Sequence, residues 1–287
     1  MASRVLFSVM ATVLGVVCRG PGSCHLAPAS RGQGARLSAV AALAFILGLP
    51  SASADPQSDP QAGPRAVIEL FTSQGCSACP AADKLMSELQ SVPSFIPLTL
   101  AIDYWDILGW KDTLALPGHT RRQRAYAQMR GDRDIYTPQA VVNGVAQAIG
   151  SDLKEIEGAV AQSYVNNAPL SVPVKVTIAD GNIAVTVPAR DNDPASEIWL
   201  CPVSGQVSVD IARGENRGHT MTYTNVVRRW IKLGAWDGRS ETTVTVPVDA
   251  VKGEGVDAFA VLVQSGTSKQ PGAIVGASLT PLKSAVP

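Results

Sequence analysis

The 287-residue sequence lacks net charge, is poor in aromatic residues, and has no apolar run long enough to span a membrane. Its 24 basic residues balance 24 acidic ones, and aromatic residues make up 5% of the chain. An apolar run of about 13 residues is short for a transmembrane helix, which needs roughly 20. Without a basic excess there is no general attraction for nucleic acid or anionic lipid, so we exclude both as partners. Hydrophobic residues make up 46% of the chain, which is enough for one or two globular cores.

The N-terminal region has the composition of an export signal. Arg31 and Arg36 precede the apolar run Leu37–Leu49, which leads into Ala52-Ser53-Ala54, a small-residue site of the type that signal peptidase cleaves. We therefore expect cleavage after Ala54 and a mature protein that is periplasmic or secreted, without stable membrane insertion.

Residues 1–54 are thus interpreted as a signal peptide, and residues 55–64 as a flexible, proline-rich lead. The signal contains four basic residues and no acidic one, so removing it leaves 20 basic and 24 acidic residues and a net charge of −4. An uncleaved anchor is the alternative, because Val5–Val17 is an earlier apolar stretch.

Two hydrophobic patterns follow one another along the mature chain. Residues 65–168 alternate apolar strands with amphipathic helices in the order β-α-β-α-β-β-α, and Asn143-Gly144 is typical of a two-residue hairpin turn. Residues 169–287 contain about seven short runs of alternating β-branched residues separated by turns. We predict an α/β domain over the first range and an all-β antiparallel sandwich domain over the second. The elements expected in the first domain are Ala66–Phe71, Pro80–Ser91, Ile96–Ile102, a helix within Thr113–Met129, Ala140–Asn143, Val145–Ile149 and Leu153–Tyr164.

Two of the five cysteines lie in the export signal, so the mature chain keeps Cys76, Cys79 and Cys201. Three cysteines do not make a disulfide framework of the kind found in small secreted domains. They indicate one functional pair and one remaining residue. We expect Cys201, within an apolar strand, to point into the sandwich as a small apolar thiol, the alternative being a third redox cysteine.

The segment Cys76-Ser77-Ala78-Cys79-Pro80 follows an apolar strand and opens a helix. Free N–H groups and the positive end of the helix dipole would lower the pKa of Cys76 and make it the nucleophile. Cys79, one turn inside, would be the resolving thiol. An inert structural disulfide and half of a zinc site are the alternatives. Zinc needs two more suitably spaced ligands, and the mature chain has one other Cys and two His, so we predict no metal site.

Other residues are candidates for binding a substrate. Thr137-Pro138 stands before the third strand, where a cis-proline would present a backbone edge beside the cysteines, the alternative being an ordinary trans turn. Trp105 and Asp103 follow the second strand at the carboxyl edge of the sheet, where they would contact substrate. The alternative is that Trp105 packs against an insertion and that Asp103 is exposed to solvent. Glu69, within the first strand, is either a buried acid that assists proton transfer or a solvent-facing residue.

Basic residues gather around the second predicted helix. They form either a solvated face or a carboxylate clamp for glutathione or an acidic partner. The segment Gly214–His219 is interpreted as a simple hairpin turn without chemistry. The basic residues are Arg121, Arg122, Arg124, Arg130 and Arg133.

Several segments resemble known proteins. Residues 68–79 (Ile-Glu-Leu-Phe-Thr-Ser-Gln-Gly-Cys-Ser-Ala-Cys) are similar to the first strand and active site of thioredoxin-fold proteins, particularly glutaredoxins. Residues 137–144 and the segment Gly150-Ser151-Asp152 resemble the glutaredoxin proline loop, hairpin and last-helix start. The resemblance implies a thioredoxin-like fold for residues 65–168. It also implies that Thr137, Ser151 and Asp152 bind substrate, with glutathione as a candidate co-substrate.

A closer resemblance is to a secreted bacterial thioredoxin-like family of unknown function, and it extends through the C-terminal β region. It is carried by residues 71–76, 103–112, 122–126 and 136–139. Two departures from thioredoxins are Gly75, in place of an aromatic residue, and the inter-cysteine pair Ser77-Ala78. Because reduction potential depends on that pair, the direction of electron flow is left open.

These observations lead to the prediction of an exported thiol-disulfide oxidoreductase with catalytic Cys76 and Cys79. Thr137, Pro138, Ser151, Asp152 and Trp105 are its predicted substrate-binding residues. The expected partner is a thiol or disulfide protein or glutathione, without a resident cofactor, and the sequence does not indicate an oligomeric state. The alternative is a non-catalytic binding or scaffold module in which the two cysteines form a structural disulfide.

Overall fold

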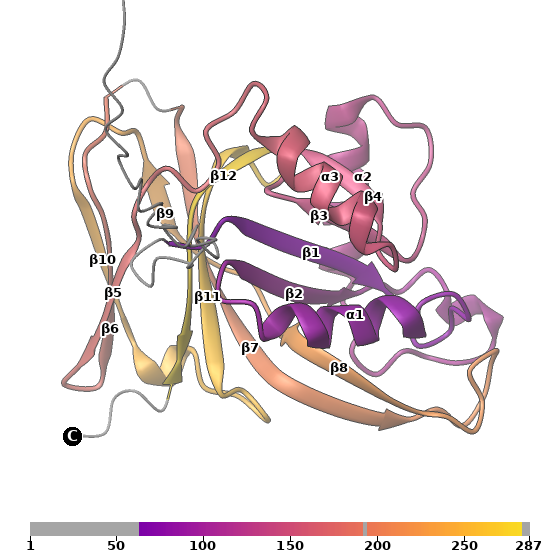
Figure 1. Cartoon of the computed structure of the whole chain (residues 1–287). Coiled ribbons are helices and arrows are strands. Elements are labelled where there is room, and N and C mark those ends of the chain that lie inside the picture. The colour runs from indigo at the N-terminus through magenta and orange to yellow at the C-terminus, as the bar shows by residue number, and fades with distance from the viewer. Residues whose placement is uncertain (1–62, 192–193, 283–287) are drawn as a thin grey trace, which may run out of the picture. The chain divides into compact units, whose positions relative to one another are not determined.

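The structure, a computed structural model, describes residues 63–191 and 194–282 (Figure 1). The predicted signal peptide and most of the predicted lead lie outside these residues. The strands are β1 (Ala66–Thr72), β2 (Phe95–Ala101), β3 (Gln139–Val142), β4 (Ala146–Ile149), β5 (Lys175–Ala179), β6 (Asn182–Val187), β7 (Ser196–Asp210), β8 (Thr220–Val227), β9 (Ile231–Trp236), β10 (Thr242–Pro247), β11 (Ala258–Thr267) and β12 (Gln270–Pro281). The helices are α1 (Pro80–Gln90), α2 (Pro117–Arg130) and α3 (Leu153–Ser163), with 3-10 turns at Asp106–Leu108 and Val248–Ala250.

A single mixed sheet of nine strands forms the centre of the described chain. Its order is β12-β11-β7-β8-β2-β1-β3-β4, and β9 also pairs with β7. The central strand β1 is buried along its whole length, which explains its uninterrupted run of mostly apolar residues. It pairs in parallel with β2 and antiparallel with β3. The turn from β3 to β4 has positive φ at both Asn143 and Gly144, as the dipeptide predicted.

The junction between the two halves of this sheet is the parallel contact of β2 with β8. Thr99 pairs with Val226 in the backbone register, and the Thr99 Oγ1 donates to the Thr224 carbonyl at 2.6 Å. Asn225 Nδ2 donates to the Pro97 carbonyl at 2.9 Å. These bonds join residues more than 120 positions apart into one sheet.

Three helices cover the β1–β4 part of this sheet. Ile68 and Leu70 of β1 pack against α1 and α3, whereas Val67 and Phe71 point to the other face, which Tyr126 of α2 helps to cover. The stripe of α1 is buried as its periodicity predicted. Asp152 caps α3 by accepting from the Glu155 N–H at 3.0 Å.

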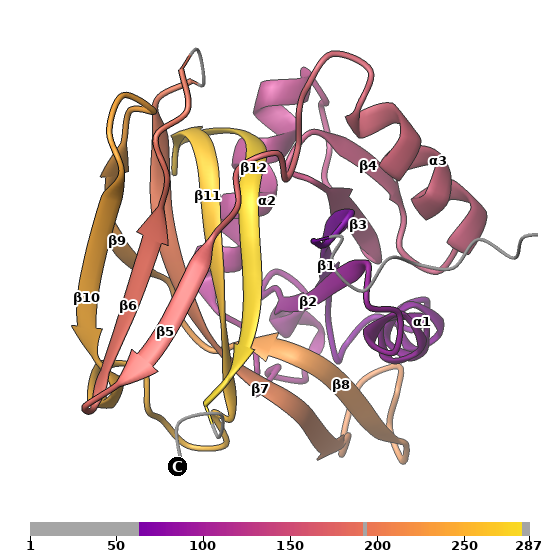
Figure 2. The same cartoon turned by 60° about the vertical axis from the view of Figure 1, so that its left-hand side comes forward.

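A second sheet, with the order β10-β6-β5, packs on the C-terminal strands of the large sheet (Figure 2). Burial alternates along β6 because one face meets β7, β11 and β12 while the other meets solvent. Residues 228–230 separate β8 from β9.

The predicted fold class, a thioredoxin-like α/β domain followed by a separate all-β antiparallel sandwich domain, is wrong. The nine-stranded sheet runs through both regions because β8 pairs with β2 and β7 continues the sheet to β11 and β12. Sequence periodicity shows which residues form strands but does not show which strands pair, and that choice is where the prediction failed. The predicted boundary between residues 168 and 169 falls in the link from α3 to β5 and stays a prediction.

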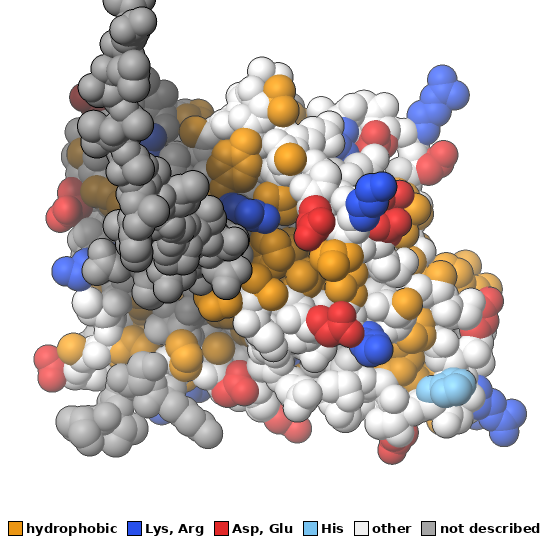
Figure 3. Space-filling view, viewed as in Figure 1, with side chains coloured by type: hydrophobic (Ala, Val, Ile, Leu, Met, Phe, Trp, Pro, Cys, Tyr) orange, Lys and Arg blue, Asp and Glu red, His pale blue; other side chains and the backbone are white. Residues whose placement is uncertain are grey.

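Within the described residues, no helix is both long and apolar enough to cross a membrane. On the face shown in Figure 3, acidic and basic side chains are interspersed around an apolar area. That distribution gives this face no field of a single sign.

Candidate dithiol site

The two adjacent cysteines lie where β1 ends and α1 begins. Cys79 is the N-cap residue of α1, and its N–H donates to the Cys76 carbonyl at 3.2 Å. Both are free thiols, with exposed fractions of 2% for Cys76 and 0% for Cys79. Pro80 occupies the first helical position, where its missing N–H breaks no hydrogen bond.

The environment gives the two thiols opposite acidities. The pKa of Cys76 is lowered from 9.0 to about 6, mainly by a hydrogen bond from the Cys79 side chain; burial opposes this shift. The Thr137 side chain and the N–H groups of Ala78 and Cys79 lower the Cys76 pKa further. The pKa of Cys79 is raised, first by burial and then by Cys76. Cys76 is therefore the group that ionises, and Cys79 remains a thiol that donates to it.

A buried acid that the sequence analysis missed lies beside this pair. Asp83 is 3% exposed, and neither of its carboxylate oxygens has a hydrogen-bond partner among the described residues. Burial is the main cause that raises its pKa well above the usual range. Its N–H donates to the Cys79 carbonyl at 3.1 Å, which places it one helical turn beyond Cys79. The only signal in the sequence was an acid next to Ala82 on the apolar stripe of α1.

The proline loop lies against Cys76, and its Thr137–Pro138 peptide bond is cis. The Sγ of Cys76 is 3.8 Å from the Thr137 carbonyl oxygen, and the Nε1 of Trp105 donates to Thr137 Oγ1 at 2.9 Å. Trp105 thus orients a residue that contacts Cys76. Gly150 fits closely here, because a Cβ would lie 2.5 Å from Leu70 Cδ1 and 3.2 Å from Pro138 Cβ, so Leu70 would have to move.

The other predicted binding residues lie at the start of α3. Ser151 and Asp152 are exposed, and the carboxylate of Asp152 is occupied as the helix cap.

Two polar residues that follow β2 in the sequence are also held by hydrogen bonds. Asp103 accepts from Thr120 Oγ1 at 2.5 Å, and His119 Nδ1 lies 2.9 Å from the Ala101 carbonyl. Across the described residues, no group of three or more His, Cys, Asp or Glu side chains has the arrangement of a metal site.

The hairpin between β7 and β8, interpreted from the sequence as a turn without chemistry, covers the dithiol. Asn216 Nδ2 donates to the carbonyls of both Gln74 and Cys76 at 2.9 Å. Glu215 Oε2 accepts from the Ser77 N–H at 3.1 Å. The Ser77 side chain, and after it this N–H, lower the Glu215 pKa. The hairpin therefore helps to bury Cys76 and holds the loop that carries it.

A second set of contacts holds that loop from the segment before α2. The Gln74 N–H donates to Asp112 Oδ2 at 2.8 Å, and Trp110 Nε1 donates to Gln74 Oε1 at 2.9 Å. Asp112 also accepts from the Leu114 N–H at 2.8 Å. The residues preceding Cys76 are thus fixed from two sides.

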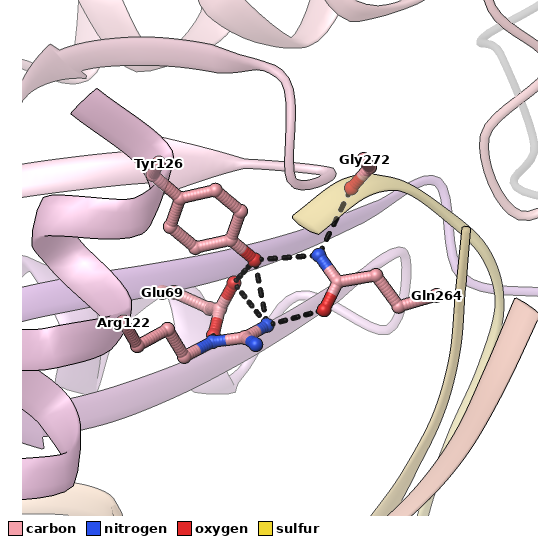
Figure 4. Close-up of polar contacts among 5 residues, drawn as sticks. All are labelled: Glu69, Arg122, Tyr126, Gln264 and Gly272. Carbon is pink, nitrogen blue, oxygen red and sulfur yellow. Dashed lines mark hydrogen bonds and ion pairs between the residues drawn. The ribbon is translucent and has the colours of Figure 1, made fainter. Parts of the chain in front are cut away.

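Glu69 does not face the dithiol. It is fully buried and forms a two-point ion pair with Arg122, at 2.6 and 3.1 Å (Figure 4). Tyr126 donates to Glu69 at 2.5 Å, and Gln264 accepts from Arg122 at 2.9 Å while donating to Tyr126 and to the Gly272 carbonyl. The network ties β1 and α2 to β11 and β12, and it makes Arg122 structural and not part of a solvated face.

The remaining cysteine, Cys201, is fully buried in the core of the large sheet. Burial raises its pKa, as for a thiol surrounded by apolar side chains.

Together the fold and site define a mixed-sheet protein with a buried, asymmetric cysteine pair at the start of a helix. The chain belongs to the family described as "Protein of unknown function (DUF1223)", which it matches over residues 67–264. It is also similar to an Agrobacterium tumefaciens protein whose X-ray crystal structure was determined by a structural genomics consortium. Sequence identity is 32%, the TM-score is 0.68, and the match covers 77% of this chain and 95% of that protein. No curated protein matches the chain.

These comparisons correct the predicted family. We expected membership of the thioredoxin and glutaredoxin superfamily through a secreted thioredoxin-like family, but the family found is one of unknown function, and neither comparison points to that superfamily. The glutaredoxin resemblance rested on residues 68–79, 137–144 and 150–152, and the secreted family was assigned from four short segments between residues 71 and 139. The family match covers residues 67–264.

Proposed function

We propose that this protein is an exported thiol-disulfide oxidoreductase whose reacting groups are Cys76 and Cys79. The observation that carries the proposal is a pair of free, buried thiols at the start of α1 with opposite pKa shifts. The pKa of Cys76 is lowered, and that of Cys79 is raised. A low-pKa thiolate next to a second thiol is the arrangement that thiol-disulfide exchange requires.

In the reducing direction, the Cys76 thiolate attacks one sulfur of a substrate disulfide. A mixed disulfide forms, and the other substrate sulfur leaves as a thiolate that takes up a proton. Cys79 then loses its proton and attacks the Cys76 sulfur, which forms the Cys76–Cys79 disulfide and releases the second substrate thiol. Two electrons pass from the dithiol to the substrate, and the oxidising direction is the reverse.

In this proposal Asp83, whose charge raises the pKa of Cys79, takes the proton that Cys79 must lose. A carboxylate whose pKa is raised by burial is a stronger base than an ordinary one, and its unpartnered oxygens leave it free to accept. The Thr137 carbonyl lies 3.8 Å from the Cys76 Sγ, so an extended substrate segment would pair with the backbone of this loop.

The test is to trap the intermediate. The Cys79→Ser variant should retain a mixed disulfide with a substrate disulfide, because it cannot resolve it, and the Cys76→Ser variant should form none. A redox titration of the unmodified protein supplies the second measurement. A midpoint well below about −300 mV, together with no trapped adduct, would instead support a scaffold module with a structural disulfide.

A further inference from the structure

A groove separate from the dithiol lies between α2, β7, the segment after β8, and the β11–β12 turn. Its volume is about 600 Å³, within the range of pockets that hold small organic ligands. Neither cysteine and neither residue of the Thr137–Pro138 loop lines it. Its chemistry therefore stands apart from the proposed redox reaction.

The groove is cationic. Four of its lining side chains carry positive charge, and none of the described lining residues is acidic. Arg122 is neutralised by Glu69, but no described carboxylate lies within ion-pair distance of the other three, which are exposed. The three are Arg121, Arg124 and Lys269. Because these three cations line one groove and have no counter-charges, they favour the binding of an anion there.

One wall of the groove is aromatic. Trp199 and Trp230 are half-buried and meet edge to face, with ring centroids 6.1 Å apart. The Nε1 of Trp230 is buried without a hydrogen-bond partner among the described residues. Partly exposed indole rings of this kind bind a flat apolar ring by stacking or by edge-to-face contact.

The wall is also held in place before any ligand arrives. The Arg122 guanidinium lies 4.3 Å from the Trp230 ring centroid and 4.9 Å from that of Tyr126, and Glu69 fixes it by two hydrogen bonds. Since these groups are already ordered, binding would lose little side-chain entropy here.

We infer that this groove binds a small aromatic carboxylate, with its ring against Trp199 and Trp230 and its carboxylate held by Arg121 and Arg124. Guanidinium groups match a carboxylate with two parallel hydrogen bonds. A simple inorganic anion would leave the indole surface unused, and a neutral aromatic molecule would leave the cations without a counter-charge. A small aromatic anion contacts both the cations and the indole rings of the groove.

The test is calorimetric titration of the purified protein with 2-naphthoate. We expect saturable binding with one site per chain, and binding at least tenfold weaker for 2-naphthalenemethanol and for acetate, which lack the charge and the ring respectively. The inference would be overturned by the absence of saturable binding, or by equal affinity for either comparison compound.

Variants locate the site. Arg121→Gln with Arg124→Gln should weaken 2-naphthoate binding by about tenfold or more, because charge-assisted hydrogen bonds are lost. Both side chains are exposed, so the fold should persist, which circular dichroism can verify. Arg239→Gln, an exposed arginine that does not line the groove, is the matched control and should bind as the parent does. Unchanged binding in the double variant would place the ligand elsewhere and refute the assignment.

Discussion

Asn216 Nδ2 donates a 2.9 Å hydrogen bond to the carbonyl oxygen of Cys76, across 140 positions of sequence. The same nitrogen also reaches the Gln74 carbonyl at 2.9 Å. A hairpin of the C-terminal half therefore holds the loop that carries Cys76. Access to Cys76 depends on how firmly this hairpin stays in place.

Asn216→Ala should make Cys76 react faster with iodoacetamide. The substitution leaves two buried carbonyls without their donor, which we expect to destabilise the fold by about 1–3 kcal/mol and to loosen the hairpin. Alkylation rates measured by mass spectrometry give the readout. Asn182→Ala, which removes a single exposed hydrogen bond to the Asp180 carbonyl, serves as control. An unchanged rate would mean that the hairpin does not limit access.

The rate of Cys76 alkylation should follow a titration with a midpoint near pH 6. The thiolate is the reactive form, and the pKa of Cys76 is lowered to about 6, mainly by the hydrogen bond from Cys79. Cys79→Ala removes that donor, so the midpoint should move upward. A midpoint close to that of a free peptide thiol, about 8.5, would remove the basis of the proposed chemistry.

Ionisation of Cys76 should also affect stability. A group whose folded pKa is depressed stabilises the fold above its unfolded pKa, and this contribution is lost as the pH falls through the folded pKa. For Cys76 the window runs from pH 9 down to pH 6. The free energy of unfolding of the reduced protein, compared with Cys76→Ser, should therefore rise from pH 6 to pH 9 in urea titrations. The pKa of Cys79 is raised, so its ionisation affects the free energy of unfolding only above this pH window.

Asp83→Asn should slow the resolving step and leave the first attack unchanged. In stopped-flow measurements the mixed disulfide should accumulate, because Cys79 loses its proton acceptor. The variant should also be more stable at neutral pH, since an unpartnered buried carboxyl with a raised pKa destabilises the fold as the pH rises above its unfolded value. Glu88→Gln, an exposed change on the same helix, is the control. Equal resolution rates would show that Asp83 takes no part.

Breaking the buried pair of Glu69 and Arg122 should cost more than any surface change. Glu69→Gln leaves a buried guanidinium without its counter-charge, and we expect a loss of about 3–5 kcal/mol in urea unfolding. The double variant Glu69→Gln with Arg122→Met should lose less than the sum of the two single variants. Strict additivity would show that the two side chains do not act as a unit.

Local features of this protein could be predicted from the sequence because neighbouring residues determine them. The helix after Cys79, the left-handed turn at Asn143-Gly144 and the Asp152 cap depend on contacts within a few positions. The placement of Cys76 at a helix start followed from the same local pattern. The buried acid Asp83 was missed because one acid on a helix stripe does not show what surrounds it.

The sequence by itself determined the strands, the helices and the position of the cysteine pair, since hydrophobic period and turn residues act over short distances. Only the tertiary structure decided that β2 pairs with β8, that Asn216 covers Cys76, and that Glu69 meets Arg122. Many alternating strands of similar composition can pair with one another, and the choice depends on packing the whole core at once.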